Sequence, residues 1–219
     1  MTSALRYHCL KLQALVLLAV GRAQAALSRF DRLLQLQPLD RYALASRAHV
    51  LAQLNHVDGA IASLQQLTAA WPQEAAGWFN LGFVLQQAGR HDEAARAFRS
   101  ALERDARMDR AWYGLALVLM QQREFRQALG ALKKNTALQP LSPHGWYRMA
   151  QVQLALGQPE EARKLINHLR RFEPRVAAQL ERETGQVGGA FLRAPASAAM
   201  SDAKIGQYGP CSGAARSES

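Results

Sequence analysis

The sequence is poor in cysteine, proline and β-branched residues, and each scarcity excludes a class of protein. Two cysteines, Cys9 and Cys211, lie near opposite ends of the 219-residue chain and form no CxxC pair. Neither a disulfide framework nor a zinc or redox motif is therefore expected. With 8 prolines and 15 glycines, and few β-branched residues, the chain does not resemble a β-sheet protein. Alanine, leucine, glutamine and arginine are abundant instead, and these residues favour helices.

Motifs of enzyme chemistry are also missing. The sequence has no Gly-rich phosphate loop, no HExxH and no nucleophile elbow. The run from His91 to Glu93 begins an expected helix, where acidic side chains suit the positive end of the helix dipole. The histidines His8, His49 and His144 lie some distance apart and do not indicate a metal site. We expect a protein that is not an enzyme and that holds no cofactor or metal.

No apolar run is long enough for a membrane span, since the longest extends only from Leu12 to Val20. With Arg6 and Lys11 before it and an A-x-A sequence ending at Ala25, this run also has the composition of a secretory signal. One interpretation is a cytoplasmic protein whose first helix is retained, and we favour it. The other is a periplasmic or envelope-associated protein whose first 25 residues are cleaved.

Tryptophan recurs at a fixed interval in the middle of the chain. Trp78, Trp112 and Trp146 are 34 residues apart, and the same step backwards reaches Leu44 and Leu10. Four residues after each of these positions stands alanine or glycine, and sixteen after each stands alanine without exception. Small residues at fixed places predict close crossings between helices, and the tryptophans are predicted to fill the space between the two helices of one unit.

Turn residues fall at matching places in the repeat. Gly21, Gly89 and Gly157, and also Asn55, stand where one helix ends and needs a left-handed residue. Arg123 adopts that conformation less easily, so the fourth turn is predicted to differ. Proline closes four of the units. Ala106 takes its place in the other, and we predict that the helix there runs on toward Asp109.

This pattern resembles the tetratricopeptide repeat family, whose 34-residue unit reads W-x2-L-G-x2-Y, then A-x3-F, then P. The third unit carries it as Trp78, Leu81, Gly82, Leu85, Ala94 and Phe98. The resemblance implies an all-α, right-handed α-solenoid of about five helix–turn–helix repeats. The expected division is an N-terminal lead at 1–6, repeats at 7–40, 41–74, 75–108, 109–142 and 143–176, a capping helix at 177–185 and a disordered tail at 186–219.

The resemblance also implies a concave groove, lined by the first helices of successive units, in which partners bind. Large aromatic side chains at these positions are expected to be exposed anchors, although neighbouring units could instead cover them. One subset of the family binds a C-terminal carboxylate with Lys, Asn and Arg side chains. In this chain Ala45 and His49 stand where that subset has Lys and Asn, and Gly114 replaces a further basic residue, so the complete carboxylate site is not expected. The candidate groove residues are Tyr42, His49, Phe79, Asn80, Phe83, Arg110, Tyr113, Leu117, Tyr147 and Arg148.

The net charge is +10, and most basic residues fall on the second helices, away from the expected groove. A continuous basic stripe for nucleic acid is therefore not expected, whereas contact with an acidic protein or an anionic membrane surface remains open.

We expect an adaptor or scaffold that binds a peptide or helix of another protein. The alternatives are an envelope assembly or secretion factor and a regulatory partner of a transferase. The sequence does not indicate an oligomeric state.

Overall fold

The structure is a computed structural model, and it describes residues 3–185. Every regular element in this range is an α-helix, so the all-α prediction is confirmed. The predicted disordered tail lies outside the described residues. The helices are α1 (Ser3–Ala19), α2 (Ala23–Leu36), α3 (Arg41–Gln53), α4 (Val57–Ala70), α5 (Ala75–Gln87), α6 (His91–Arg104), α7 (Asp109–Gln121), α8 (Phe125–Leu138), α9 (Pro143–Ala155), α10 (Pro159–Arg170) and α11 (Pro174–Gly185).

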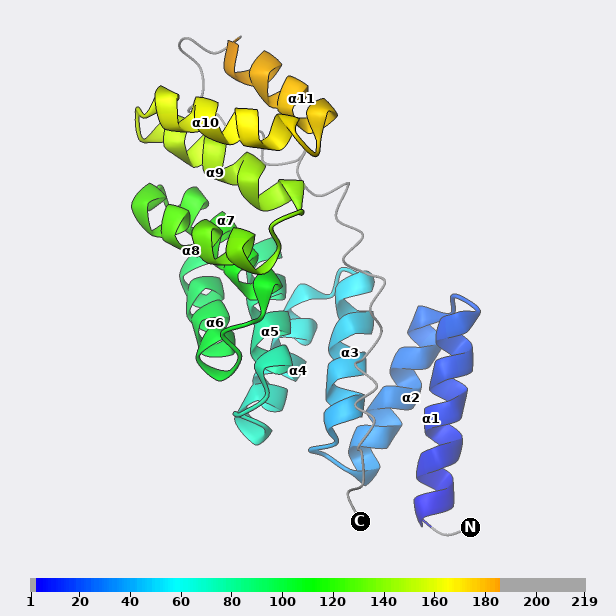
Figure 1. Cartoon of the computed structure of the whole chain (residues 1–219). Coiled ribbons are helices and arrows are strands. Elements are labelled where there is room, and N and C mark those ends of the chain that lie inside the picture. The colour runs from blue at the N-terminus through cyan, green and yellow to red at the C-terminus, as the bar shows by residue number, and fades with distance from the viewer. Residues whose placement is uncertain (1–2, 186–219) are drawn as a thin grey trace, which may run out of the picture.

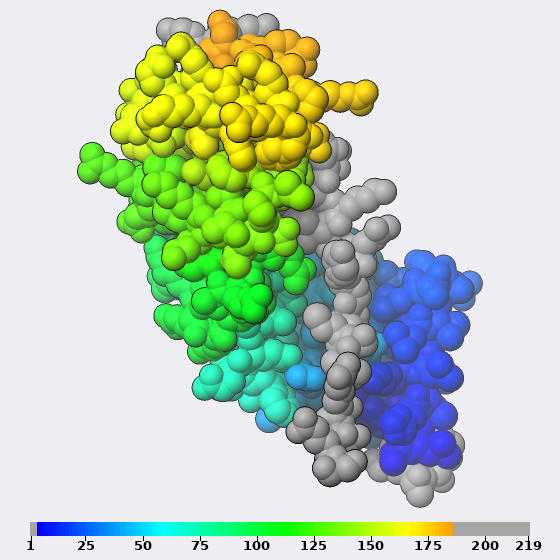
Figure 2. Space-filling view, viewed as in Figure 1, coloured from blue at the N-terminus to red at the C-terminus, as the bar shows by residue number. Residues whose placement is uncertain are grey.

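The helices pack as sequential pairs that stack into a curved array. Figure 1 shows α1 and α2 at one end, α11 at the other and the remaining pairs between them in chain order. The colours of the space-filling view follow one another along the molecule in the same order (Figure 2). Each pair therefore buries its apolar face against its neighbours in the sequence, as expected for a solenoid.

Small residues make the close helix crossings possible. The five alanines that repeat at one position of the unit, Ala26, Ala60, Ala94, Ala128 and Ala162, are all 0% exposed. Phe98 of α6, also 0% exposed, fits between two glycines on neighbouring helices. A Cβ atom would lie 2.9 Å from its ring at Gly82 of α5 and 2.6 Å from it at Gly114 of α7. Phe98 thus joins one helix pair to the next.

All five turns within the helix pairs use one residue in the left-handed region. The φ angles are 74°, 73° and 72° at Gly21, Gly89 and Gly157, 60° at Asn55 and 62° at Arg123. The prediction that the Arg123 turn differs is therefore wrong. The backbone hydrogen bond from Glu124 N to Leu119 O, 2.8 Å long, closes the same turn as in the other pairs. That bond holds Arg123 in a conformation that its side chain disfavours.

The helix before Ala106 ends without a proline, contrary to the prediction that it would run on. Helix α6 stops at Arg104, and Asp105 adopts an extended conformation with φ −140°. The carboxylate of Asp105 then accepts a hydrogen bond from Arg107 N at 2.9 Å. A side-chain turn at Asp105 replaces the steric stop that proline gives elsewhere.

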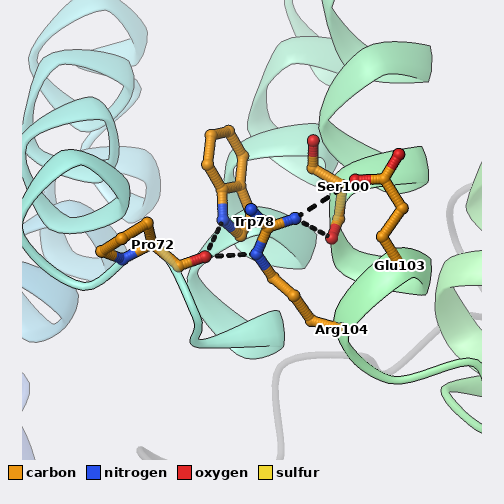
Figure 3. A network of polar contacts seen from close by, with 5 residues as sticks. All are labelled: Pro72, Trp78, Ser100, Glu103 and Arg104. Atoms are coloured by element: carbon orange, nitrogen blue, oxygen red, sulfur yellow. Dashed lines mark hydrogen bonds and ion pairs between the residues drawn. The ribbon is translucent and has the colours of Figure 1, made fainter.

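The repeated tryptophans pack against the core from its edge. Two of them contact the second helix of their own pair, as predicted: Trp78 meets Arg104 of α6, and the ring centroids of Trp146 and His168 of α10 are 4.3 Å apart. All three tryptophans are half-buried, and each indole Nε1–H donates to a carbonyl six residues earlier. Trp78 bonds to Pro72 O, Trp112 to Ala106 O and Trp146 to Pro140 O, all at 2.9 Å. Around Trp78, Arg104 stacks on the indole ring at 5.0 Å and also donates to Pro72 O (Figure 3). The tryptophans therefore fasten the turns between pairs.

Candidate functional site

The ten predicted groove residues all lie on the first helices of successive pairs. Because the unit has 34 residues, they fall into rows that run from helix to helix. One row contains Phe79, Tyr113 and Tyr147, and another contains His49, Phe83 and Leu117. We call the surface formed by the ten residues, together with Lys11 and His144, the first-helix face.

Phe79 is not an exposed anchor, contrary to the prediction. Its side chain is only 7% exposed, and its ring packs against Phe98 with centroids 5.9 Å apart. The guanidinium of Arg110, from the next pair, covers the remaining side at 5.0 Å from the ring centroid. The neighbouring unit therefore buries the phenyl ring and presents a cation at that place.

The other nine predicted residues keep at least part of their side chains accessible. Three of them are exposed, and they are His49, Asn80 and Arg110. Six are half-buried, and they are Tyr42, Phe83, Tyr113, Leu117, Tyr147 and Arg148. The structure does not test whether any of them contacts a partner, so their binding role stays a prediction.

Residues of neighbouring first helices meet at a constant spacing of 31 positions. Lys11 Nζ lies 4.2 Å from the ring centroid of Tyr42. Phe79 and Arg110 form the second such contact, and the rings of Tyr113 and His144 form a third, with centroids 6.5 Å apart. Lys11 and His144 were not among the predicted site residues. The signal that could have identified them is this 31-residue step. If the units are counted from residues 7, 41, 75, 109 and 143, the step links the fifth residue of one unit to the second residue of the next.

Two tyrosines on first helices, Tyr7 of α1 and Tyr147 of α9, donate hydrogen bonds to carboxylates outside the first-helix face. The hydroxyl of Tyr7 donates to Asp40 Oδ2 at 2.9 Å. Burial, followed by this bond and the charge of Asp40, raises the pKa of Tyr7 to about 12. The hydroxyl of Tyr147 donates to Glu183 of α11. Burial and then Glu183 raise the pKa of Tyr147 as well, so its hydroxyl is already engaged by the terminal helix.

The first-helix face carries an excess of positive charge. Within residues 3–185, Lys11, Arg110 and Arg148 form no ion pair with a carboxylate. Arg148 instead donates to Gln151 Oε1 at 2.8 Å and lies 5.7 Å from the ring centroid of Tyr147. Stacking on aromatic rings orients the cations without neutralising them. The imidazole of His49 is exposed, yet desolvation by the surrounding protein lowers its pKa.

Comparisons with known proteins agree with this architecture. Models of the tetratricopeptide repeat match residues 11–75, 45–107, 85–144 and 119–181, and the chain therefore belongs to the tetratricopeptide repeat family. No sequence among the curated proteins matches it. Within residues 3–185, no helix combines the length and the apolar character that crossing a membrane requires, and no group of three or more His, Cys, Asp or Glu could hold a metal ion.

Solved structures that resemble the chain share its fold at low sequence identity. A crystal structure of MamA protein is 17% identical, with a TM-score of 0.72 over 84% of this chain and 96% of that one. A MamA fragment from Desulfovibrio magneticus RS-1 is 16% identical, with a TM-score of 0.70 over 81% and 96%. YrrB, described as a TPR protein with an unusual peptide-binding site, is 18% identical, with a TM-score of 0.68 over 77% and 88%.

Proposed function

We propose that the protein is a non-enzymatic scaffold whose first-helix face lines a groove for a segment of another protein. The observation that carries this proposal is the series of oriented cations and half-buried aromatic rings along successive first helices. Lys11, Arg110 and Arg148 have no carboxylate partner within the described residues. A segment with acidic and apolar side chains would supply both the charge and the contact area that this face offers.

Fold similarity adds a second, weaker support. YrrB carries the words "peptide-binding site" in its description, which concerns that protein alone. A shared solenoid does not transfer a ligand, because function depends on the side chains of the site and not on the fold. We therefore base the choice of an acidic segment on the charges of this chain.

We propose that helix α1 is retained in the mature protein, which favours a cytoplasmic adaptor. Helix α1 packs on α2, with Leu10 8% and Ala14 0% exposed, and Tyr7 bonds to Asp40. Removal of residues 1–25 would delete these contacts together with Lys11. The intact mass of the native protein tests this point. A mature chain that begins after Ala25 would instead favour an envelope assembly or secretion factor, and a co-purifying transferase would favour a regulatory role.

The binding proposal is tested by capture of partners from a lysate, followed by affinity measurement on the captured segment. The test variant is Arg110→Glu, and the control is Arg126→Glu, which makes the same charge change on an exposed position of α8. We expect Arg110→Glu to weaken binding by about tenfold or more, while Arg126→Glu retains nearly all of it. Equal losses in both variants would mean that net charge and not the first-helix face determines binding.

A further inference from the structure

Helix α1 exposes a line of apolar residues on the side that faces away from the array. Leu12 is 64% exposed, Val16 54% and Leu5 52%, and Cys9 and Ala19 are exposed as well. The steps between Leu5, Cys9, Leu12, Val16 and Ala19 are four, three, four and three residues. We call these five residues the α1 seam. Alternating steps of three and four keep a row of side chains on one face of a helix, in the spacing that packs against a second helix.

The two ends of the array differ in chemistry. At the far end, α11 buries Ala177 and Leu180 and turns polar residues such as Gln179, Glu181 and Arg182 to solvent. At the near end, α1 lies at the outer edge of the array, with α2 between it and α3 (Figure 1). A solenoid needs a polar outer face at each end to stay soluble as a monomer, and the α1 seam does not provide one.

We propose that the α1 seam binds the α1 seam of a second copy of this chain, with the two helices antiparallel. A two-fold axis can place Leu5 level with Val16 of the second copy and Cys9 level with Leu12 of the second copy. Each of the four layers formed by Leu5, Cys9, Leu12 and Val16 then pairs one leucine with a smaller residue, and Ala19 lies beyond these layers. A parallel arrangement in register would instead stack Leu12 on Leu12 and Cys9 on Cys9, so that layers alternate between crowded and underfilled. Self-complementary patches of this kind are typical of two-fold dimers.

Charge also favours the antiparallel arrangement. Helix α1 contains Arg6, His8 and Lys11 in its first half, no charged residue in its second half and no acidic residue at all. Antiparallel packing places Arg6 beside the uncharged second half of the other helix, near its negative dipole end. Parallel packing would bring the two Arg6 side chains together. Lys11 comes nearly level with Lys11 of the second copy, but each Lys11 lies over Tyr42 of its own chain and not on the seam.

Sedimentation velocity over a wide concentration range tests the proposal on the full chain. We expect the wild type to dimerise with increasing concentration. Cys9→Glu or Leu12→Lys should each weaken the dimer by about a hundredfold or more, because a two-fold interface buries each new charge twice. The control is Leu141→Lys, at a residue that is 78% exposed on a turn between pairs, and it should dimerise like the wild type. Circular dichroism checks that each variant stays helical.

A mixture of the two seam variants tests the orientation. In the antiparallel dimer, Glu introduced at position 9 meets Lys introduced at position 12 of the other copy, so the mixture should dimerise although each variant alone does not. A mixture that stays monomeric would overturn the antiparallel arrangement. A wild type that is monomeric at every concentration would overturn the proposal. If that monomer instead bound vesicles of phosphatidylcholine and phosphatidylglycerol, and Cys9→Glu abolished the binding, the seam would be a lipid-binding face.

This inference is independent of the proposed binding groove. The seam variants change the outward side of α1, whereas Lys11 and Tyr7 of the same helix face Tyr42 and Asp40. Loss of dimerisation with unchanged capture of partners would therefore leave the groove proposal standing, and the reverse result would leave the dimer standing. The intact mass of each sample establishes that α1 is present.

Discussion

Arg123 holds a backbone conformation in which side chains are disfavoured. Its φ angle is 62°, close to the 73° of Gly89 at the equivalent turn. A left-handed residue with a Cβ atom costs roughly 1–2 kcal/mol, and glycine avoids most of this cost. We expect Arg123→Gly to raise the free energy of unfolding by about 1 kcal/mol. Urea denaturation followed by circular dichroism measures the change.

Gly89→Ala is the matched control for this prediction. A Cβ atom at Gly89 would meet nothing within 4 Å, so any loss of stability must come from the backbone angle alone. We expect this variant to be destabilised by about as much as Arg123→Gly is stabilised. A neutral result at Gly89 would show that the left-handed turn costs little in this array. The stabilisation expected at Arg123 would then lose its physical basis.

At the scale of the helix, Tyr7 and Asp40 connect the first pair to the second. Asp40 caps α3 by accepting a hydrogen bond from Ala43 N at 2.6 Å, and it also accepts the bond from Tyr7. The neutral phenol is favoured in the folded state, where the pKa of Tyr7 is raised from 10.0 to about 12. Its stabilising contribution is therefore fully present below pH 10.0 and is lost as the pH rises through about 12.

The measurement is the phenolate absorbance of the folded protein during alkaline titration. We expect Tyr7 to ionise about two pH units above its ordinary value. Because the pKa of Tyr147 is raised as well, Tyr7→Phe should remove one of two late-ionising tyrosines and leave the other. The wild type should also lose thermal stability more steeply than Tyr7→Phe as the pH rises from 10.0 to about 12. Titration of every tyrosine near the ordinary pKa would contradict the bond between α1 and α3. The absorbance of Asp40→Asn shows how much of the shift depends on the carboxylate charge.

For the molecule as a whole, periodicity revealed the helices but not the contacts between units. The 34-residue interval of Trp78, Trp112 and Trp146 predicted the all-α array because the same packing problem recurs in every unit. It did not reveal that Arg110 covers Phe79, because that contact crosses from one unit to the next. Gly114 was predicted to be a groove position that lacks a basic side chain. The structure shows that its missing side chain leaves space for the ring of Phe98 from the preceding pair. Positions within one unit could be predicted from the family pattern, and contacts between units required coordinates.

Coupling between neighbouring pairs leads to a prediction for the whole array. A solenoid is stabilised by its units and by the interfaces between adjacent units, so damage at one interface should spread only locally. Gly114→Ala would place a Cβ atom 2.6 Å from the ring of Phe98, which α5, α6 and α7 share. Overpacking of this kind costs roughly 1–3 kcal/mol. We expect hydrogen exchange measured by mass spectrometry to accelerate from α5 to α8 while α1 and α2 keep their protection.

The control for this experiment is Gly130→Ala on α8, where a Cβ atom would meet nothing within 4 Å. Because alanine favours the helix interior by roughly 1 kcal/mol over glycine, exchange there should slow or stay the same. Equal acceleration in every helix of Gly114→Ala would show that the array unfolds as one cooperative unit. Acceleration confined to the centre would mean that the two ends open and close independently. The first-helix face could then adapt its middle to a bound segment while α1 and α11 stay folded.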